Sequence, residues 1–157
     1  MKEIALTRGL VALVDDEDFE RLSRHKWYAD SKGYARTYMH HPEIPGKRIS
    51  VKMHRFVLGL CNGDEHQVDH RDLRHANNQK RNLRISTPSQ NACNKSRQAN
   101  NSSGFKGVTH AKNGKWRARV RVNNKRISLG TFETPEAAFS AYCQAASKMH
   151  GEFARLT

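Results

Sequence analysis

The stretch VDHRDLRHANNQKRNLRISTPSQN, residues 68–91, decides how the middle of the chain folds. Residues 67–70 have the pattern of a strand end, 71–80 form a polar loop, and 82–86 read as a second strand. The tetrapeptide 87–90, Thr-Pro-Ser-Gln, places Thr at an N-cap, Pro at the first helical position and Gln at the third, which is the capping-box pattern. The sequence therefore predicts a strand, a loop, a strand and a helix in that order.

Four polar side chains in this unit have the chemistry that phosphodiester hydrolysis needs, namely a base for water and a cation for the phosphate and the departing oxygen. Asp69 is a hard oxygen ligand, and His70 is a base with a suitable unperturbed pKa. Asn91 offers an amide oxygen from the first turn of the helix, and Asn82 completes the set. Because alternation along a strand sends Asp69 and His70 to opposite faces, we expect both to lie where regular pairing stops.

The motifs at 53–55, 68–70, 82–84 and 87–91 resemble, in the same order, the ββα-metal core of the HNH endonucleases, especially the free-standing homing endonucleases of phages. The resemblance covers roughly residues 50–95. It implies an enzyme that cuts duplex DNA and leaves a 5′-phosphate and a 3′-hydroxyl.

The same resemblance assigns roles to the four residues. It implies that His70 is the general base, that Asp69 and Asn91 hold one divalent metal ion, and that Asn82 braces the loop that orients His70. The last position is Asn91, where many HNH nucleases carry His. With two oxygen ligands from the protein, phosphate and water complete the set, which suits Mg²⁺ or Mn²⁺ better than Zn²⁺.

Other histidines and arginines near the motif have alternative interpretations. His66 and His70 would form a metal-binding pair only on a helix, and this segment looks extended. His54 is expected to pack or to contact the DNA backbone. Four arginines either form a solvated rim or, as we expect beside a scissile phosphate, bind backbone phosphates. They are Arg71, Arg74, Arg81 and Arg84.

A second module follows residues 97–103, which lack apolar anchors and are expected to be a linker. Strand-like segments at 105–110, 115–122 and 125–130 are separated by Asn113-Gly114 and Asn123-Asn124, which are hairpin-turn signals. Thr134-Pro135 then opens an amphipathic helix that ends near Gly151. The pattern predicts a three-stranded antiparallel sheet covered by one helix.

Residues 104–157 resemble the plant ethylene-response-factor (APETALA-type) DNA-binding domain. The motifs that carry the resemblance include Gly-Phe-Lys-Gly-Val at 104–108, Gly-Lys-Trp-Arg-Ala at 114–118 and Leu-Gly-Thr-Phe at 129–132. Because that family lays its sheet in the major groove, the resemblance implies DNA contacts from one set of basic residues. The set is Lys106, Arg117, Arg119, Arg121 and Arg126. Arg119 stands where many plant members have Glu, so their target sequence cannot be carried over.

Charge and composition agree with a nucleic-acid partner. Lys and Arg total 28 against 15 acidic residues, a net charge of +13, and basic residues are dense at 71–126. No stretch approaches 18 apolar residues or forms a signal peptide, so we expect no membrane partner and a cytoplasmic protein. The three cysteines, Cys61, Cys93 and Cys143, are far apart and predict small buried or half-buried side chains rather than disulfides or a zinc site.

The whole chain is expected to be α+β, with an N-terminal accessory region at 1–48, an HNH core at 49–96, the linker and the DNA-binding module at 104–157. In the first region we expect a helix from Asp15 to about His25 and a hairpin around 31–33. A strand at 49–53 and a short helix over 56–60, broken at 62–63, follow.

Two other functions agree less well with the sequence than a nuclease does. A DNA-binding regulator with an inactive HNH remnant is disfavoured because all four motif residues are retained. An RNA-binding protein is disfavoured because interleaved aromatic residues are lacking. One catalytic constellation per chain and two unlike modules predict a monomer on duplex DNA that nicks one strand first, while a dimer through residues 1–48 stays open.

Overall fold

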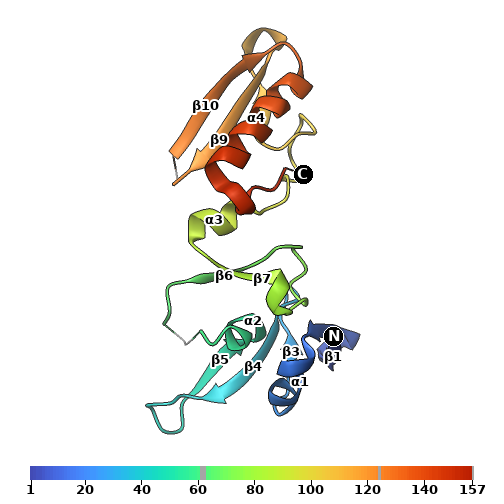
Figure 1. Ribbon diagram of the computed structural model, residues 1–157, viewed down its shortest axis with the longest axis vertical. Helices are drawn as coiled ribbons and strands as arrows, with labels where there is room; N and C mark the ends of the chain where they lie inside the picture. The colour runs from blue at the N-terminus through green and yellow to red at the C-terminus, as the bar shows by residue number, and fades with distance from the viewer. Residues whose placement is uncertain (61–62, 124, 157) are drawn as a thin grey trace. The chain divides into compact units, whose positions relative to one another are not determined.

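The computed structural model describes residues 1–60, 63–123 and 125–156 of the chain. These residues form two compact units, Met1–Ile85 and Ser86–Thr157, each built from helices and small sheets (Figure 1). The predicted α+β class is confirmed. Within the part that the structure describes, no helix has the length and apolar character needed to span a bilayer.

Three small sheets and two short α-helices make up the described part of the first unit. The elements are β1 (Lys2–Ala5), β2 (Val11–Val14), α1 (Asp16–Ser23), β3 (Tyr28–Ala29), β4 (Ala35–His40), β5 (Arg48–Lys52), α2 (Met53–Val57), β6 (Gln67–His70) and β7 (Leu83–Ser86). β1 pairs with β2, β4 lies between β3 and β5 in an antiparallel sheet, and β6 pairs with β7. The expected hairpin around 31–33 and the strand pair that carries the HNH motif are both present.

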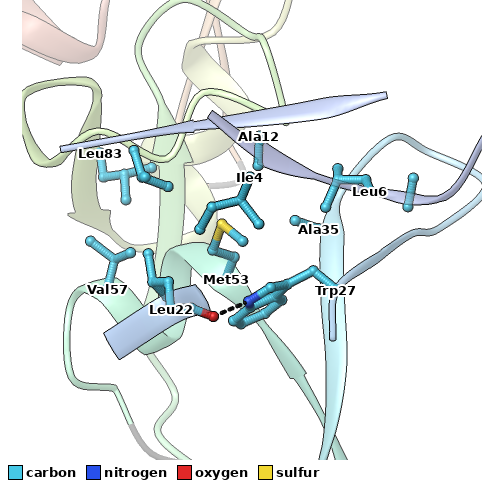
Figure 2. Close-up of a cluster of buried hydrophobic side chains, with 11 residues drawn as sticks. Ile4, Leu6, Ala12, Leu22, Trp27, Ala35, Met53, Val57 and Leu83 are labelled. Atoms are coloured by element: carbon cyan, nitrogen blue, oxygen red, sulfur yellow. Dashed lines mark hydrogen bonds between the residues drawn. The ribbon is translucent and has the colours of Figure 1, made fainter. Parts of the chain in front are cut away.

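One hydrophobic core joins these elements, with the exception of β5 (Figure 2). Leu22 of α1 and Met53 of α2 are completely buried, and Leu83 of β7 packs in the same cluster. Trp27 lies beside them, and its indole Nε1 donates a buried hydrogen bond to the carbonyl oxygen of Leu22 (2.8 Å). Because each large apolar side chain contributes about 1.5–3 kcal/mol on burial, residues on both sides of position 48 stabilise one another.

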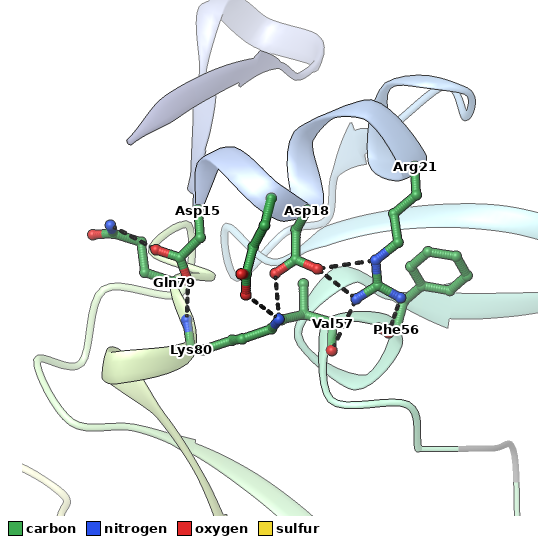
Figure 3. Close-up of polar contacts among 8 residues, drawn as sticks. Asp15, Asp18, Arg21, Phe56, Val57, Gln79 and Lys80 are labelled. Atoms are coloured by element: carbon green, nitrogen blue, oxygen red, sulfur yellow. Dashed lines mark hydrogen bonds and ion pairs between the residues drawn. The ribbon is translucent and has the colours of Figure 1, made fainter.

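The acidic helix α1 is tied to the chain segment that leads into β7 (Figure 3). Asp15 occupies the N-cap position as expected, but its carboxylate caps no amide of its own helix. It accepts hydrogen bonds instead from the backbone N–H of Lys80 (2.7 Å) and the side chain of Gln79 (3.2 Å). The buried carboxylate of Asp18 pairs with Arg21 (2.7 Å), which also donates to the carbonyl of Val57. The acidic cluster is therefore a structural clamp.

Several boundaries differ from the expected ones. α1 ends at Ser23 rather than near His25, because Trp27 turns back to the carbonyl of Leu22. α2 spans Met53–Val57 rather than 56–60, since Met53 is already in the helix and points into the core. The expected break at 62–63 falls partly on Asn62, which lies outside the described residues.

The second unit contains α3 (Pro88–Cys93), β8 (Val108–His110), β9 (Trp116–Val122), β10 (Lys125–Phe132) and α4 (Pro135–His150). The strands form an antiparallel sheet in the order β10-β9-β8, and α4 packs against one of its faces (Figure 1). The capping box at the start of α3 is confirmed, and Thr134 caps α4. Asn113 has a φ of 64° in the first hairpin turn. Asn124 of the second expected turn lies outside the described residues.

Gly107 explains why β8 begins at Val108 instead of near 105. Its φ is +75°, a left-handed conformation that ends the extended backbone. A Cβ atom at this position would lie 2.1 Å from the ring of Tyr142, which comes from α4. The glycine therefore lets α4 approach the sheet edge. Cys93 and Cys143 are half-buried as expected, while Cys61 lies outside the described residues.

Candidate active site and DNA-binding sheet

The strand pair β6–β7 places Asp69 and His70 at the end of regular pairing, as the alternation argument requires. His70 is the last residue of β6, and the next N–H, that of Arg71, donates to the carbonyl of Asn82 (2.9 Å). Both Asp69 and His70 are only 3% exposed. The two side chains with the chemistry of a metal ligand and a base therefore lie in a protected part of the first unit.

Asp69 is held by a buried ion pair. The guanidinium of Arg84 in β7 donates from Nε (2.8 Å) and from Nη2 (2.7 Å) to the same carboxylate oxygen, Oδ2. Arg84 is 8% exposed, so the pair is shielded from water. Arg84 was expected among the phosphate-binding arginines, whereas in the structure its guanidinium points inward to Asp69. Strand alternation places Arg84 and buried Leu83 on opposite sides of β7, and this pattern alone does not predict the ion pair with Asp69.

The surroundings of His70 favour its neutral imidazole form. Burial, followed by the charge of the nearby His75, lowers the pKa of His70 to about 4, although a hydrogen bond with Asn78 and the charges of Asp72 and Asp69 oppose this shift. Since neutral imidazole accepts a proton, the side chain is in the form that a general base needs.

Three aromatic rings pack around the imidazole of His70. Its ring centre lies 5.1 Å from that of His54, 5.8 Å from Tyr34 and 5.9 Å from His75. Tyr34 stacks on His75 at 3.9 Å, and the Nδ1 of His75 donates to the carbonyl of Lys32 (2.7 Å). The hairpin of β3 and β4 therefore builds one wall of the site, a contribution that sequence analysis missed.

Asn82 holds the loop that follows His70. Its Oδ1 accepts from the backbone N–H of Asp72 (3.1 Å), and its Nδ2 donates to the Asp72 carboxylate (2.9 Å) and to the carbonyl of Asn77 (2.9 Å). The side chain is buried, so these bonds form without competition from solvent. This geometry fits the bracing role that the resemblance implied.

Asp69 and Asn91 are the two residues expected to bind a divalent metal ion. Asp69 offers carboxylate oxygen in the first unit, and Asn91, with an amide oxygen, lies on α3 in the second unit. No group of three or more His, Cys, Asp or Glu side chains that would make a complete metal site occurs in residues 1–60, 63–123 and 125–156. Carboxylate and amide oxygens such as those of Asp69 and Asn91 are of the hard donor type that Mg²⁺ accepts, so their chemistry is compatible with such an ion.

The remaining arginines beside the motif are on the surface. Arg71, Arg74 and Arg81 are all exposed in the loop and turn between β6 and β7. Their positions follow Asp69 and His70 along the chain, so cationic side chains border the candidate site.

The sheet of the second unit presents its arginines away from α4. Ala118 and Val120 are buried under the helix, while Arg117 and Arg121, which alternate with them, are exposed. Arg126 of β10 is also exposed and pairs in register with Arg121. Two cations thus lie side by side on the open face.

Two further candidates of this sheet are engaged within the protein. Arg119 is half-buried and donates to the hydroxyl of Thr109 (3.1 Å). Lys106 donates to the carbonyls of Cys93 (2.7 Å) and Arg155 (3.0 Å), and burial lowers its pKa. In this arrangement Lys106 fixes the end of α3 within its own unit.

Comparisons with known proteins agree with both halves of this geometry. An uncharacterised HNH endonuclease of Acanthamoeba polyphaga mimivirus is 32% identical over 151 residues, which are 94% of this chain and 74% of the viral protein. The chain belongs to the HNH endonuclease family. The resemblance of 50–95 to that family is confirmed.

The C-terminal third of this HNH protein matches the AP2 domain family over residues 103–152. Dehydration-responsive element-binding protein 2A of Arabidopsis thaliana is 48% identical over 54 residues, 33% of this chain and 16% of the plant protein. An ethylene-responsive transcription factor of the same plant is 46% identical over 54 residues, 33% of this chain and 29% of its own length. These two plant proteins match this chain over about the length of the AP2 domain.

Proposed function

We propose that this HNH protein is a metal-dependent endonuclease that hydrolyses one phosphodiester of duplex DNA. The observation that carries the proposal is the burial of the consecutive residues Asp69 and His70 at the end of β6, where each is only 3% exposed. Membership of the HNH endonuclease family and the AP2 match support a nuclease that binds DNA. We also propose that the enzyme is a nuclease of the homing-endonuclease type found in phages.

The roles follow from the chemistry of each side chain. His70 takes the proton from the attacking water, and Asn82 keeps the loop after His70 in one conformation through its bonds to Asp72 and Asn77. Asp69 and Asn91 would hold the divalent ion, which supplies charge neutralisation at the phosphate and the departing oxygen. The rings of Tyr34 and His75, with centres 5.8 Å and 5.9 Å from that of His70, limit the directions from which water can approach the imidazole.

The test is cleavage of supercoiled plasmid with and without Mg²⁺. His70→Ala is expected to remove cutting and to leave duplex affinity nearly unchanged, because it deletes the base and few phosphate contacts. His66→Ala is the matched control, since His66 is exposed and bonded to Asp64. Cutting at the normal rate in His70→Ala contradicts its role. No cutting by the unaltered protein with any divalent metal favours a DNA-binding regulator instead.

The sheet of the second unit binds the duplex in this proposal. Arg121→Ala is expected to weaken binding by about 1–3 kcal/mol if the side chain reads a base, and uniformly across sequences if it contacts phosphate. Lys148→Ala on α4, the opposite side of the sheet, is the control, because Lys148 is exposed there. Equal affinity of both variants would place the interface elsewhere.

We also propose that one chain nicks one strand first, because each chain carries one Asp69–His70 pair. A time course on plasmid with enzyme in excess is expected to show open circles before linear DNA. Linear product from the first time point would reveal concerted cutting of both strands and would require a second chain.

A further inference from the structure

The outward face of the β3–β4–β5 sheet carries side chains that the proposed function leaves without a role. In the antiparallel register Tyr28 lies opposite Arg36, and Arg36 lies opposite Lys52. Tyr38 and Arg48 lie farther along the same face, opposite Ser50 and His40. The alternate residues, among them Ala29 and Ala35, are buried in the core. Alternation therefore separates a core face from a polar and aromatic one.

This outward face is strongly basic. Arg48 and the preceding Lys47 are exposed, and Lys52 is half-buried, so that burial and the neighbouring Arg36 lower its pKa. Arg36 is paired with Asp30 at 2.8 Å. Arg48 and Lys52 on this face, together with Lys47 in the turn just before β5, leave a net positive charge beside the balanced pair, which attracts a polyanion.

Two tyrosines form a platform in the middle of the face. The rings of Tyr28 and Tyr38 stack with their centres 5.6 Å apart and their planes at 18°. Tyr38 is 60% exposed, so the platform is open to solvent. A tyrosine hydroxyl donates hydrogen bonds to phosphate oxygens, and Arg and Lys beside it supply charge.

The same face is continuous with the candidate active site. The ammonium of Lys52 lies 4.9 Å from the ring centre of Tyr34, and Tyr34 packs against His75 and His70. A polyanion that contacts Lys52 therefore lies next to the residues that surround His70. The positive charge, the exposed tyrosine rings and the continuity with His70 all fit a nucleic acid as the partner of this face.

We propose that the outward face of the β3–β4–β5 sheet is a second DNA-binding surface that contacts the backbone of the duplex flanking the phosphate at His70. The location beside a scissile phosphate rests on the proposed nuclease function, whereas the binding itself does not. A two-stranded ribbon such as β4–β5 fits the dimensions of the major groove, which lets both of its edges approach phosphates.

The experiment measures binding of the full chain to a random-sequence duplex in chelator, where cleavage cannot interfere, over a series of NaCl concentrations. The double variant Lys47→Gln, Arg48→Gln is expected to lower the slope of log affinity against log salt by about 2, since each phosphate contact contributes about 0.9. Tyr38→Ala is expected to weaken binding several-fold. Arg24→Gln is the control, because Arg24 is 71% exposed at the C-cap of α1 and lies off this face.

Each outcome has a definite consequence. A slope in the double variant equal to that of Arg24→Gln overturns the surface, even when plasmid cutting is normal. A smaller slope in a protein that cuts no DNA supports the surface and refutes the nuclease proposal. A loss of affinity confined to single-stranded DNA or to RNA overturns the duplex as the occupant.

Discussion

At the scale of single residues, the buried pair of Arg84 and Asp69 makes a measurable prediction. Arg84→Ala removes two N–H donors from a carboxylate that is 3% exposed, which is expected to destabilise the first unit by about 3–5 kcal/mol. Arg81→Ala, at an exposed neighbouring position, is expected to change stability by less than about 0.5 kcal/mol. Urea unfolding followed by Trp27 fluorescence in a Trp116→Phe background checks both values. Equal stability of the two variants would mean that the pair contributes nothing.

His54 gives the first unit a dependence on pH. Burial, followed by the charge of His70, lowers the pKa of His54 to about 2 from its usual 6.5. The unfolded chain takes up this proton below pH 6.5 and the folded chain does not, so stability is fully present above pH 6.5 and falls as the pH drops towards 2. Each such histidine contributes a limiting slope of about 1.4 kcal/mol per pH unit.

The pH prediction is checked by urea unfolding at several pH values between 7 and 4. His54→Gln is expected to reduce the slope by about one proton, and His110→Gln, in the exposed part of the second unit, to leave it unchanged. An unchanged slope in His54→Gln would show that this imidazole titrates normally in the folded protein.

At the scale of elements, the approach of α4 to the sheet depends on Gly107. Gly107→Ala would place a methyl group within 2.1 Å of the Tyr142 ring and would keep a φ of +75°, so we expect a loss of about 2–4 kcal/mol in the second unit. Gly114→Ala has a similar φ of +72° but no atom within 4 Å, and therefore measures the backbone strain alone. Thermal unfolding compares the two variants. Equal losses would leave no role for the contact with Tyr142.

The elements that sequence patterns predicted well are those with strong local signals. The capping box at Thr87, the Pro at the start of α4 and the alternation in β9 depend on neighbouring residues, and all of them are found. The ends of α1 and α2 were placed wrongly, because a buried tryptophan and a core methionine decide them through contacts distant in sequence.

In the candidate site, too, residues with local sequence signals were predicted, and residues placed by contacts distant in sequence were not. Asp69, His70 and Asn82 were predicted as site residues from their order along the chain, and all three lie in the first unit and are buried. Tyr34 and His75 were missed because a ring contact over some 40 residues leaves no periodic signal. Arg84 was grouped with the exposed arginines of the same segment, because nothing in the local sequence distinguishes it from them.

At the scale of the whole molecule, the exposed segment 95–100 is the expected site of first proteolytic attack. It has no regular secondary structure and contains Lys95 and Arg97. Brief digestion with trypsin, analysed by mass spectrometry, is expected to cut there first. The double variant Lys95→Gln, Arg97→Gln should resist this first cut. A first cut in the loop 41–47 would show that segment to be the more accessible one.

The shared core of the first unit has a consequence for protein engineering. The motif that carries the chemistry lies after residue 48, yet its strand pair packs through Leu83 on side chains such as Ile4 and Leu22. A transplant of residues 49–96 into another scaffold would leave these apolar surfaces bare and prone to aggregation. A chimaeric nuclease built from this chain should therefore carry all of Met1–Ile85 together with the end of β7 and with α3, which bears Asn91.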